Sequence, residues 1–170
     1  MSCSRKGVRS LSKLFMTFAS GTVAARLRQQ PGVIVANGTE TILLAEGDKS
    51  PFQSGKTFQI EEAEGQFVPK GNIVYANIPV DSNARSLLFH RLLKDKSRLG
   101  FGHSGFAAYR LGFDPDDNHG IVFIQFVEGG NRFRDSTDYV LFQEWLKESV
   151  EKPGSGPIIK HYVVDEVDDL

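Results

Sequence analysis

The stretch GFAAYRLGFDPDDNHGIVFIQFVEGG, residues 105–130, decides the fold, because two apolar runs flank a short polar segment. The runs GFAAYRLGF and GIVFIQFVEG are rich in β-branched and aromatic residues, which is typical of strands. The polar segment between them contains Asp114, Asp116, Asp117, Asn118 and His119. Either this segment binds a metal ion or it is the turn of a hairpin.

The spacing of the polar segment favours the turn. Asp114, Asp116 and Asn118 have the alternation of a calcium-binding loop, but the sixth position is His119 instead of glycine and the twelfth is Gln125 instead of glutamate. The missing glutamate would supply two of the oxygen ligands. The flanks are strand-like, and the proline after the first aspartate presets φ for a turn. We therefore predict a solvated hairpin turn and no metal site.

Bulk composition places the chain among ordinary globular proteins. Its 170 residues are 40% apolar and include 13 Phe, so a substantial aromatic core is expected. The formal net charge of -1 gives no global attraction to nucleic acid or to a membrane surface. The single cysteine, Cys3, allows no internal disulfide, and no apolar run approaches the roughly 18 residues of a transmembrane helix. We predict a cytoplasmic monomer or homodimer with a basic tail over residues 1–12.

The second half of the chain predicts the element order β-α-β-β-α-β. The expected strands cover residues 72–80, 105–113, 120–129 and 158–167, and the expected helices cover residues 81–99 and 135–152. This order is that of the ferredoxin-like fold, an antiparallel sheet with both helices on one face. The apolar residues of each helix are predicted to share a face: Ala84, Leu87, Leu88, Phe89, Leu92 and Leu93 in the first, and Tyr139, Leu141, Phe142, Trp145, Leu146 and Val150 in the second.

The first half predicts a smaller, mostly β unit. Residues 13–20 are expected to form a strand and residues 21–30 a short helix, which Pro31-Gly32 ends. Asn37-Gly38 is the strongest short hairpin signal in the chain and separates two β-rich runs, residues 33–36 and 40–47. Residues 57–67 are expected to add a further strand or edge segment.

Local motifs for catalysis or ligation are weak. His90 is predicted on the polar helix face, His103 in a glycine-rich link, His119 in the turn and His161 on the last strand, as a sheet-face or structural residue. No histidine spacing indicates a zinc site, and G-x-S-x-G and phosphate-loop patterns do not occur. The residues therefore indicate neither a hydrolase nor a nucleotide-binding protein.

A family resemblance adds to these inferences. GFAAYRL before a loop, VFIQFVE with Phe133 five residues after Glu128, and an aromatic amphipathic helix resemble the antibiotic biosynthesis monooxygenase (ABM) superfamily. The upstream segments KLFMTFASGTVAARLRQQ and TILLAEGDKSPFQSGKTFQI resemble one branch of it, in which a β-rich half precedes the ABM domain. That branch includes a Bacillus heme-degrading monooxygenase and the staphylococcal signal protein TRAP.

The resemblance implies a site between the helices and the sheet. In heme-degrading members a histidine of the last helix ligates iron, and this position falls on Leu146, which cannot do so. An asparagine of the first ABM strand falls on Ala76, with Asn77 one residue later and therefore expected on the opposite face of the strand. A family tryptophan is replaced by Val127. The resemblance as a whole implies heme or another flat apolar ligand and no other cofactor, and these three departures mean that efficient turnover is not expected.

The sequence thus predicts an α+β chain with a basic tail (residues 1–12), an N-terminal β-rich half (residues 13–70) and a ferredoxin-like ABM domain (residues 71–167), the first half completing a barrel within one chain. Asn77 is the catalytic candidate. The ligand-lining candidates are Leu146, Trp145, Phe142, Tyr139, Phe89 and Leu92. Three functions remain open: a relative of heme-degrading monooxygenases that binds heme or another flat apolar ligand, a cofactor-independent oxygenase of a small aromatic, and a non-catalytic TRAP-like stress or regulatory protein.

Overall fold

The computed structural model describes residues 13–19, 21–79, 105–116, 119–128, 133–148 and 157–166. The helix expected over residues 81–99, which contains Phe89 and Leu92, lies outside these ranges. The elements of the described residues are β1 (Lys13–Phe18), α2 (Gly21–Leu27), β2 (Ile34–Asn37), β3 (Thr41–Gly47), β4 (Lys56–Glu64), β5 (Asn72–Pro79), β6 (Phe106–Asp114), β7 (His119–Phe126), α5 (Thr137–Glu148) and β8 (Ile158–Val164).

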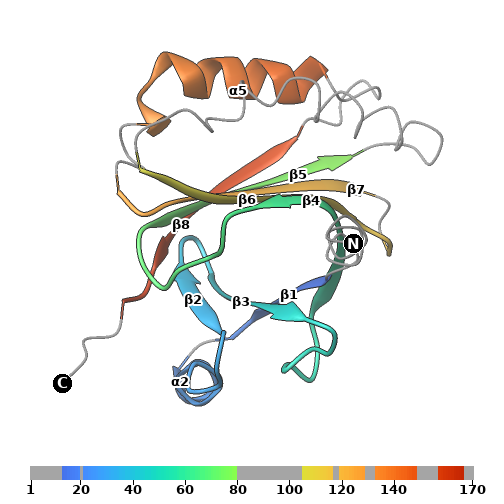
Figure 1. Ribbon diagram of the computed structural model, residues 1–170, viewed down its shortest axis with the longest axis vertical. Helices are drawn as coiled ribbons and strands as arrows, with labels where there is room; N and C mark the ends of the chain where they lie inside the picture. Colours follow the sequence, from blue (N-terminus) through green and yellow to red (C-terminus); the bar gives the residue numbers. More distant parts are fainter. Residues whose placement is uncertain are drawn as a thin grey trace, which may run out of the picture.

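The strands close into one barrel (Figure 1), in the order β1-β3-β2-β8-β5-β7-β6-β4. Every neighbouring pair is antiparallel. The four strands of the first half are contiguous in this order, and so are the four strands of the second half. The α+β fold class and the prediction that the N-terminal half completes a barrel within one chain are therefore confirmed.

Two seams join the halves. At the longer one, β4 pairs with β6 over five residue pairs. At the shorter one, β2 pairs with β8 over only two, so side chains reinforce the contact. The carboxylate of Glu40 accepts hydrogen bonds from Lys160 Nζ at 2.7 Å and from the hydroxyl of Tyr162 at 3.0 Å. Nearby, Arg28 pairs with Asp165 at 3.0 Å. Polar contacts thus close the barrel where its ladder is shortest.

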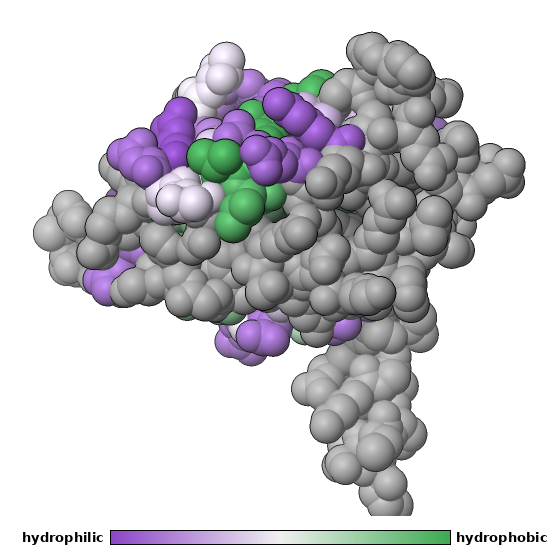
Figure 2. Space-filling view, turned by 90° about the horizontal axis from the view of Figure 1, so that it is seen from above, coloured by the Kyte–Doolittle hydropathy of each residue, from purple (hydrophilic) through white to green (hydrophobic). Residues whose placement is uncertain are grey.

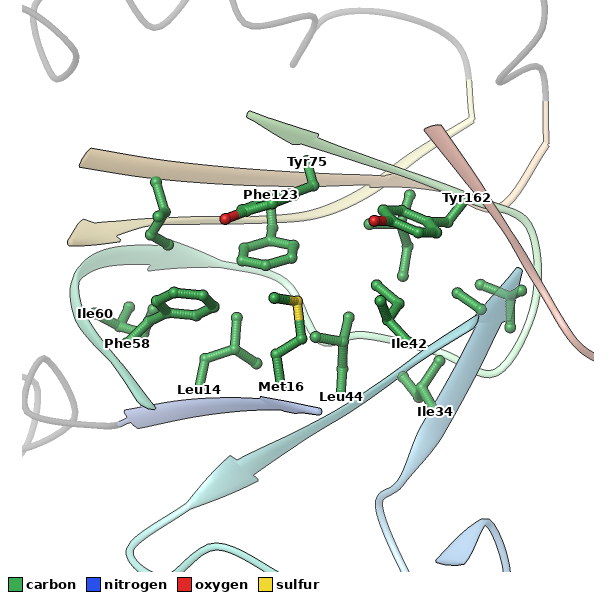
Figure 3. Close-up of a cluster of buried hydrophobic side chains, with 14 residues drawn as sticks. Leu14, Met16, Ile34, Ile42, Leu44, Phe58, Ile60, Tyr75, Phe123 and Tyr162 are labelled. Carbon is green, nitrogen blue, oxygen red and sulfur yellow. The ribbon is translucent and has the colours of Figure 1, made fainter. Parts of the chain in front are cut away.

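The barrel interior is a packed apolar core (Figure 3). Alternate residues of each strand point inward because side chains of a strand alternate between its two faces. Tyr75 and Phe123 stack with ring centroids 4.6 Å apart, and Phe58 lies 5.8 Å from Phe123. Leu14, Met16 and Leu44 fill the opposite wall in the same figure. Apolar side chains therefore pack against one another inside the barrel.

Polar side chains close one end of the barrel. Arg110 is 5% exposed, and its guanidinium donates to the Glu46 carboxylate and to the carbonyls of Glu64, Gly65 and Tyr109. Gln125, which is fully buried, donates to the carbonyls of Val68 and Lys70 and accepts from the Val68 N–H. The two side chains thereby tie the segment between β4 and β5 across this end.

Helices cover opposite sides of the barrel (Figure 1). α5 lies over the second-half sheet, and α2 lies over the outer face of the first-half strands, where Ala24 packs with Phe15, Val35 and Leu43. No helix among the described residues is long and apolar enough to cross a membrane.

Two details differ from the sequence-based expectations. The loop after β2 has three residues, because Asn37 pairs with Thr41 and caps the turn by accepting from the Thr41 hydroxyl at 2.8 Å. The predicted face of α5 is also wrong at Leu141, which is 42% exposed. Residues of a helix turn by about 100° each, so Leu141 falls away from the side shared by Tyr139, Phe142 and Leu146. Figure 2, which looks from above onto the outer surface of the molecule, shows apolar residues among polar ones.

Candidate functional site

The candidate site is the layer between α5 and the sheet face beneath it. On α5, Phe142 and Leu146 are fully buried and Tyr139 is half-buried, a spacing of three and four residues that places all three on one face. The sheet contributes alternate residues of three strands to the same apolar cluster, Val74, Ala76, Ile78, Tyr109, Leu111, Val122, Ile124 and Phe126. Three of the predicted wall residues are thus brought together.

An aromatic chain runs through this layer. Phe133, just before α5, lies with its ring centroid 4.8 Å from that of Phe126 and 6.1 Å from that of Phe142. Tyr139 meets Phe133 edge-on at 5.5 Å, a favoured arrangement of aromatic rings. Sequence reasoning did not assign Phe133 to the site. The signal in the sequence was the position of Phe133 five residues after Glu128, which the family resemblance used.

Among the described side chains, one polar pair lies in the layer with the apolar cluster. The hydroxyl of Tyr139 is 2.8 Å from Nε2 of His161, which projects from β8 beside Val74. Burial, together with a smaller effect of the positive charge of Arg134, lowers the pKa of His161 to about 4, so the imidazole is neutral at pH 7. Burial also raises the pKa of Tyr139. The Tyr139 hydroxyl and the His161 imidazole therefore form a hydrogen bond between two neutral groups.

The remaining candidates are placed as follows. Trp145 lies on α5, but its side chain is outside the described part of the structure, as are Phe89 and Leu92. Asn77 lies on the barrel-interior face of β5, opposite to Ala76, because β5 pairs with β7 in unbroken register. The amide oxygen of Asn77 is 2.6 Å from Nδ1 of His119, and its nitrogen donates to the Tyr75 hydroxyl at 3.0 Å.

β6 and β7 pair antiparallel up to Asp114 and His119, so the predicted hairpin is confirmed, but Asp114 at its end is buried and not solvated as expected. Asp114 is fully buried, pairs with Lys56 Nζ at 2.7 Å and accepts from the Asp116 N–H at 2.9 Å. Its carboxylate is thus already bonded to Lys56 and to the Asp116 N–H. Within the described ranges, no group of three or more His, Cys, Asp or Glu side chains is arranged to hold a metal ion.

The described side chains of the layer offer no iron ligand on α5. Leu146 is buried among carbon atoms and offers no electron pair to a metal. Among the side chains described in this layer, His161 provides a ring nitrogen, and that nitrogen is bonded to Tyr139. The helix position to which the family resemblance assigns the iron ligand therefore cannot serve as one.

The barrel and its covering helix define the class: the chain has the fold of ABM-related proteins. A Listeria monocytogenes protein described as a ferredoxin-fold relative of antibiotic biosynthesis monooxygenases superposes with TM-score 0.70 at 14% identity, over 92% of this chain and 96% of that one. No protein-family model and no curated protein sequence matches the chain.

Two further solved structures carry the same fold. A major regulator of staphylococcal pathogenesis gives TM-score 0.76 at 13% identity, over 90% of this chain and 99% of that one. A heme-degrading enzyme of Listeria monocytogenes gives TM-score 0.65 at 14% identity, over 89% and 98%. The resemblance inferred from the sequence is thereby confirmed at the level of the fold, which a regulator and an enzyme share.

Proposed function

We propose that this chain binds a flat apolar ligand, heme or another planar aromatic, between α5 and the sheet. Phe142, Leu146 and Tyr139 would form the α5 wall. Trp145 would extend this wall, and Phe89 and Leu92 would contribute from the helix that the sequence predicts over residues 81–99. The observation that carries the proposal is the Tyr139–His161 hydrogen bond, which lies beside the aromatic and aliphatic side chains described in this layer. Ligand sites combine apolar walls with a few such polar groups.

Leu146 determines whether a porphyrin in this layer could be held through its iron. Because it has no donor atom, a porphyrin in this layer would be held by apolar contacts and not through iron, so efficient heme degradation is not expected. Asn77, the catalytic candidate from the sequence, faces the other side of the sheet and bonds His119. The proposal therefore gives it no contact with a ligand in this layer.

The test is a visible-absorption titration with hemin of the unmodified protein, Leu146→His and Leu141→His. The first variant places an imidazole on the buried side of α5, and the second places one on the exposed side of the same helix as a matched control. We expect a saturable Soret shift typical of imidazole ligation at one equivalent in Leu146→His only. Identical spectra for all three proteins would contradict the location.

A non-catalytic role is the second candidate, and one observation favours it. Phe142 and Leu146 are fully buried, which is also what a closed core would require. Absence of porphyrin binding in every variant would favour this regulatory alternative, in line with the staphylococcal regulator of the same fold. Oxygenation of a small aromatic without cofactor would instead need a ligand in contact with the neutral Tyr139–His161 pair.

A further inference from the structure

The barrel wall has a gap between β2 and β3 at one end. β2 begins at Ile34, which pairs with Leu44, while β3 continues to Gly47. Continued register would place Gly32 opposite Glu46, but Gly32 has φ +81° and lies in the turn that follows α2. A Cβ added to Gly32 would meet no atom within 4 Å, so the space beside it is open.

The backbone of Glu46 faces this gap. The Asp165 N–H donates to the Val35 carbonyl at 2.7 Å, so Val35 is directed toward β8, and its neighbour Ile34 toward β3. Glu46 lies two residues beyond Leu44, the partner of Ile34, and therefore presents its N–H and C=O on the same side as Leu44 does. In the described part of the chain, no backbone bond from β2 or its preceding turn reaches these two groups.

The gap contains a pocket of about 220 Å³. Ile34 and Leu44, which project toward the barrel interior in Figure 3, line it with aliphatic surface, and Gln66 and Phe67 line it from the segment between the halves. The Arg110 guanidinium lies 4.8 Å from the Phe67 ring centroid and holds Phe67 against this end of the barrel. The pocket is below the roughly 300 Å³ of ordinary ligand sites, so its occupant is small.

Charge in the pocket is already compensated. The Glu46 carboxylate lines the pocket, and its two oxygens accept from Arg110 at 2.6 and 3.0 Å. A cationic ligand would compete with this buried guanidinium for the carboxylate, and an anionic ligand would meet the carboxylate itself. The site therefore selects a neutral ligand.

We propose that this gap binds one neutral peptide unit with an apolar side chain, added to the barrel as the missing residue opposite Glu46. Its N–H would donate to the Glu46 carbonyl, and its C=O would accept from the Glu46 N–H, as in β-strand addition. Side chains of directly opposed residues lie on the same face of a sheet, so the apolar side chain of the ligand would point inward beside Ile34 and Leu44. The inference is independent of the ligand between α5 and the sheet.

The test is an amide-resolved NMR titration of the unmodified protein with N-acetyl-leucine methylamide. We expect saturable shifts at the Glu46, Gly32 and Phe67 amides and none at Thr41, at the other end of β3. A matched probe, methylated on the leucine nitrogen, lacks the donated N–H and should bind about fivefold more weakly, as expected for one hydrogen bond. Equal binding of both probes, or no saturable shift at Glu46, would overturn the proposal.

Variants provide a second readout. Phe67→Ala removes part of the pocket lining and should weaken binding at least about threefold. Phe18→Ala, which removes an exposed ring at the end of β1, should leave binding unchanged. Equal affinities of the two variants would contradict the assigned location, and the amide spectra report whether each variant is folded.

Discussion

The hydroxyl oxygen of Tyr139 lies 2.8 Å from Nε2 of His161, and this hydrogen bond joins α5 to the last strand of the barrel. The cluster of described side chains around it is aromatic and aliphatic. Because burial lowers the pKa of His161 to about 4, the pair carries no charge at pH 7. A hydrogen bond of this kind can orient a planar ligand without placing an ion against it.

The stability of the fold should depend on the protonation of His161. Its pKa is about 4 in the folded protein and about 6.5 in an unfolded chain. Between pH 6.5 and pH 4 the folded state binds fewer protons than the unfolded chain. The stability that the neutral imidazole contributes is therefore complete above pH 6.5 and is lost as the pH falls through 4. Allowing for the partial exposure of the imidazole, the loss should be roughly 1–2 kcal/mol.

Urea unfolding of the unmodified protein and of His161→Gln between pH 7 and 4 measures this effect. The unmodified protein should lose more stability than the variant over this range. Parallel curves would show that the imidazole does not have the lowered pKa.

Arg110 should be far more sensitive to substitution than a surface arginine. Arg110→Lys keeps the charge but cannot serve its five acceptor contacts, so we expect a loss of about 2–4 kcal/mol in the free energy of unfolding. Arg28→Lys is the matched control, because the Arg28–Asp165 pair is partly exposed and should cost below about 1 kcal/mol. Equal losses in chemical denaturation would argue against a special role for the buried guanidinium.

The turn at residues 114–119 should not respond to calcium. Because the Asp114 carboxylate is occupied by Lys56 and the Asp116 N–H, added Ca²⁺ should leave the melting temperature unchanged, whereas Asp114→Asn should lower it. A calcium ion bound only to the folded state would raise the melting temperature with its concentration. A saturable rise that Asp114→Asn abolishes would restore the metal-site alternative.

Much of the fold could be predicted because its signals are local. The alternation of residues 105–113 and 120–129 and the turn chemistry between them specify a hairpin, and the structure contains it. The inward face of Asn77 also follows from strand periodicity, since a one-residue step reverses the face. The exposure of Leu141 follows from helix geometry, because each residue of a helix turns by about 100°. The apolar character of Leu141 alone did not show that it lies away from Tyr139, Phe142 and Leu146.

Contacts between distant residues could not be predicted in this way. The Tyr139–His161 bond depends on β8 lying beside β5 and under α5, which no local pattern specifies. Likewise, the pairing of Arg110 with Glu46 spans the barrel end, and the gap beside Glu46 depends on where β2 stops relative to β3. Such features depend on the register between strands that are far apart in the sequence.

The most direct test of the central claim compares hemin with metal-free protoporphyrin IX. Quenching of the single tryptophan, Trp145, would report binding next to Leu146 on α5. If apolar contacts alone hold the ring, both porphyrins should bind the unmodified protein at one site, with affinities within about twofold of each other. Phe142→Ser should weaken the binding of both porphyrins, whereas Val140→Ser, on the exposed side of α5, should not. Hemin binding at least about tenfold tighter, or no binding of either porphyrin, would contradict the account.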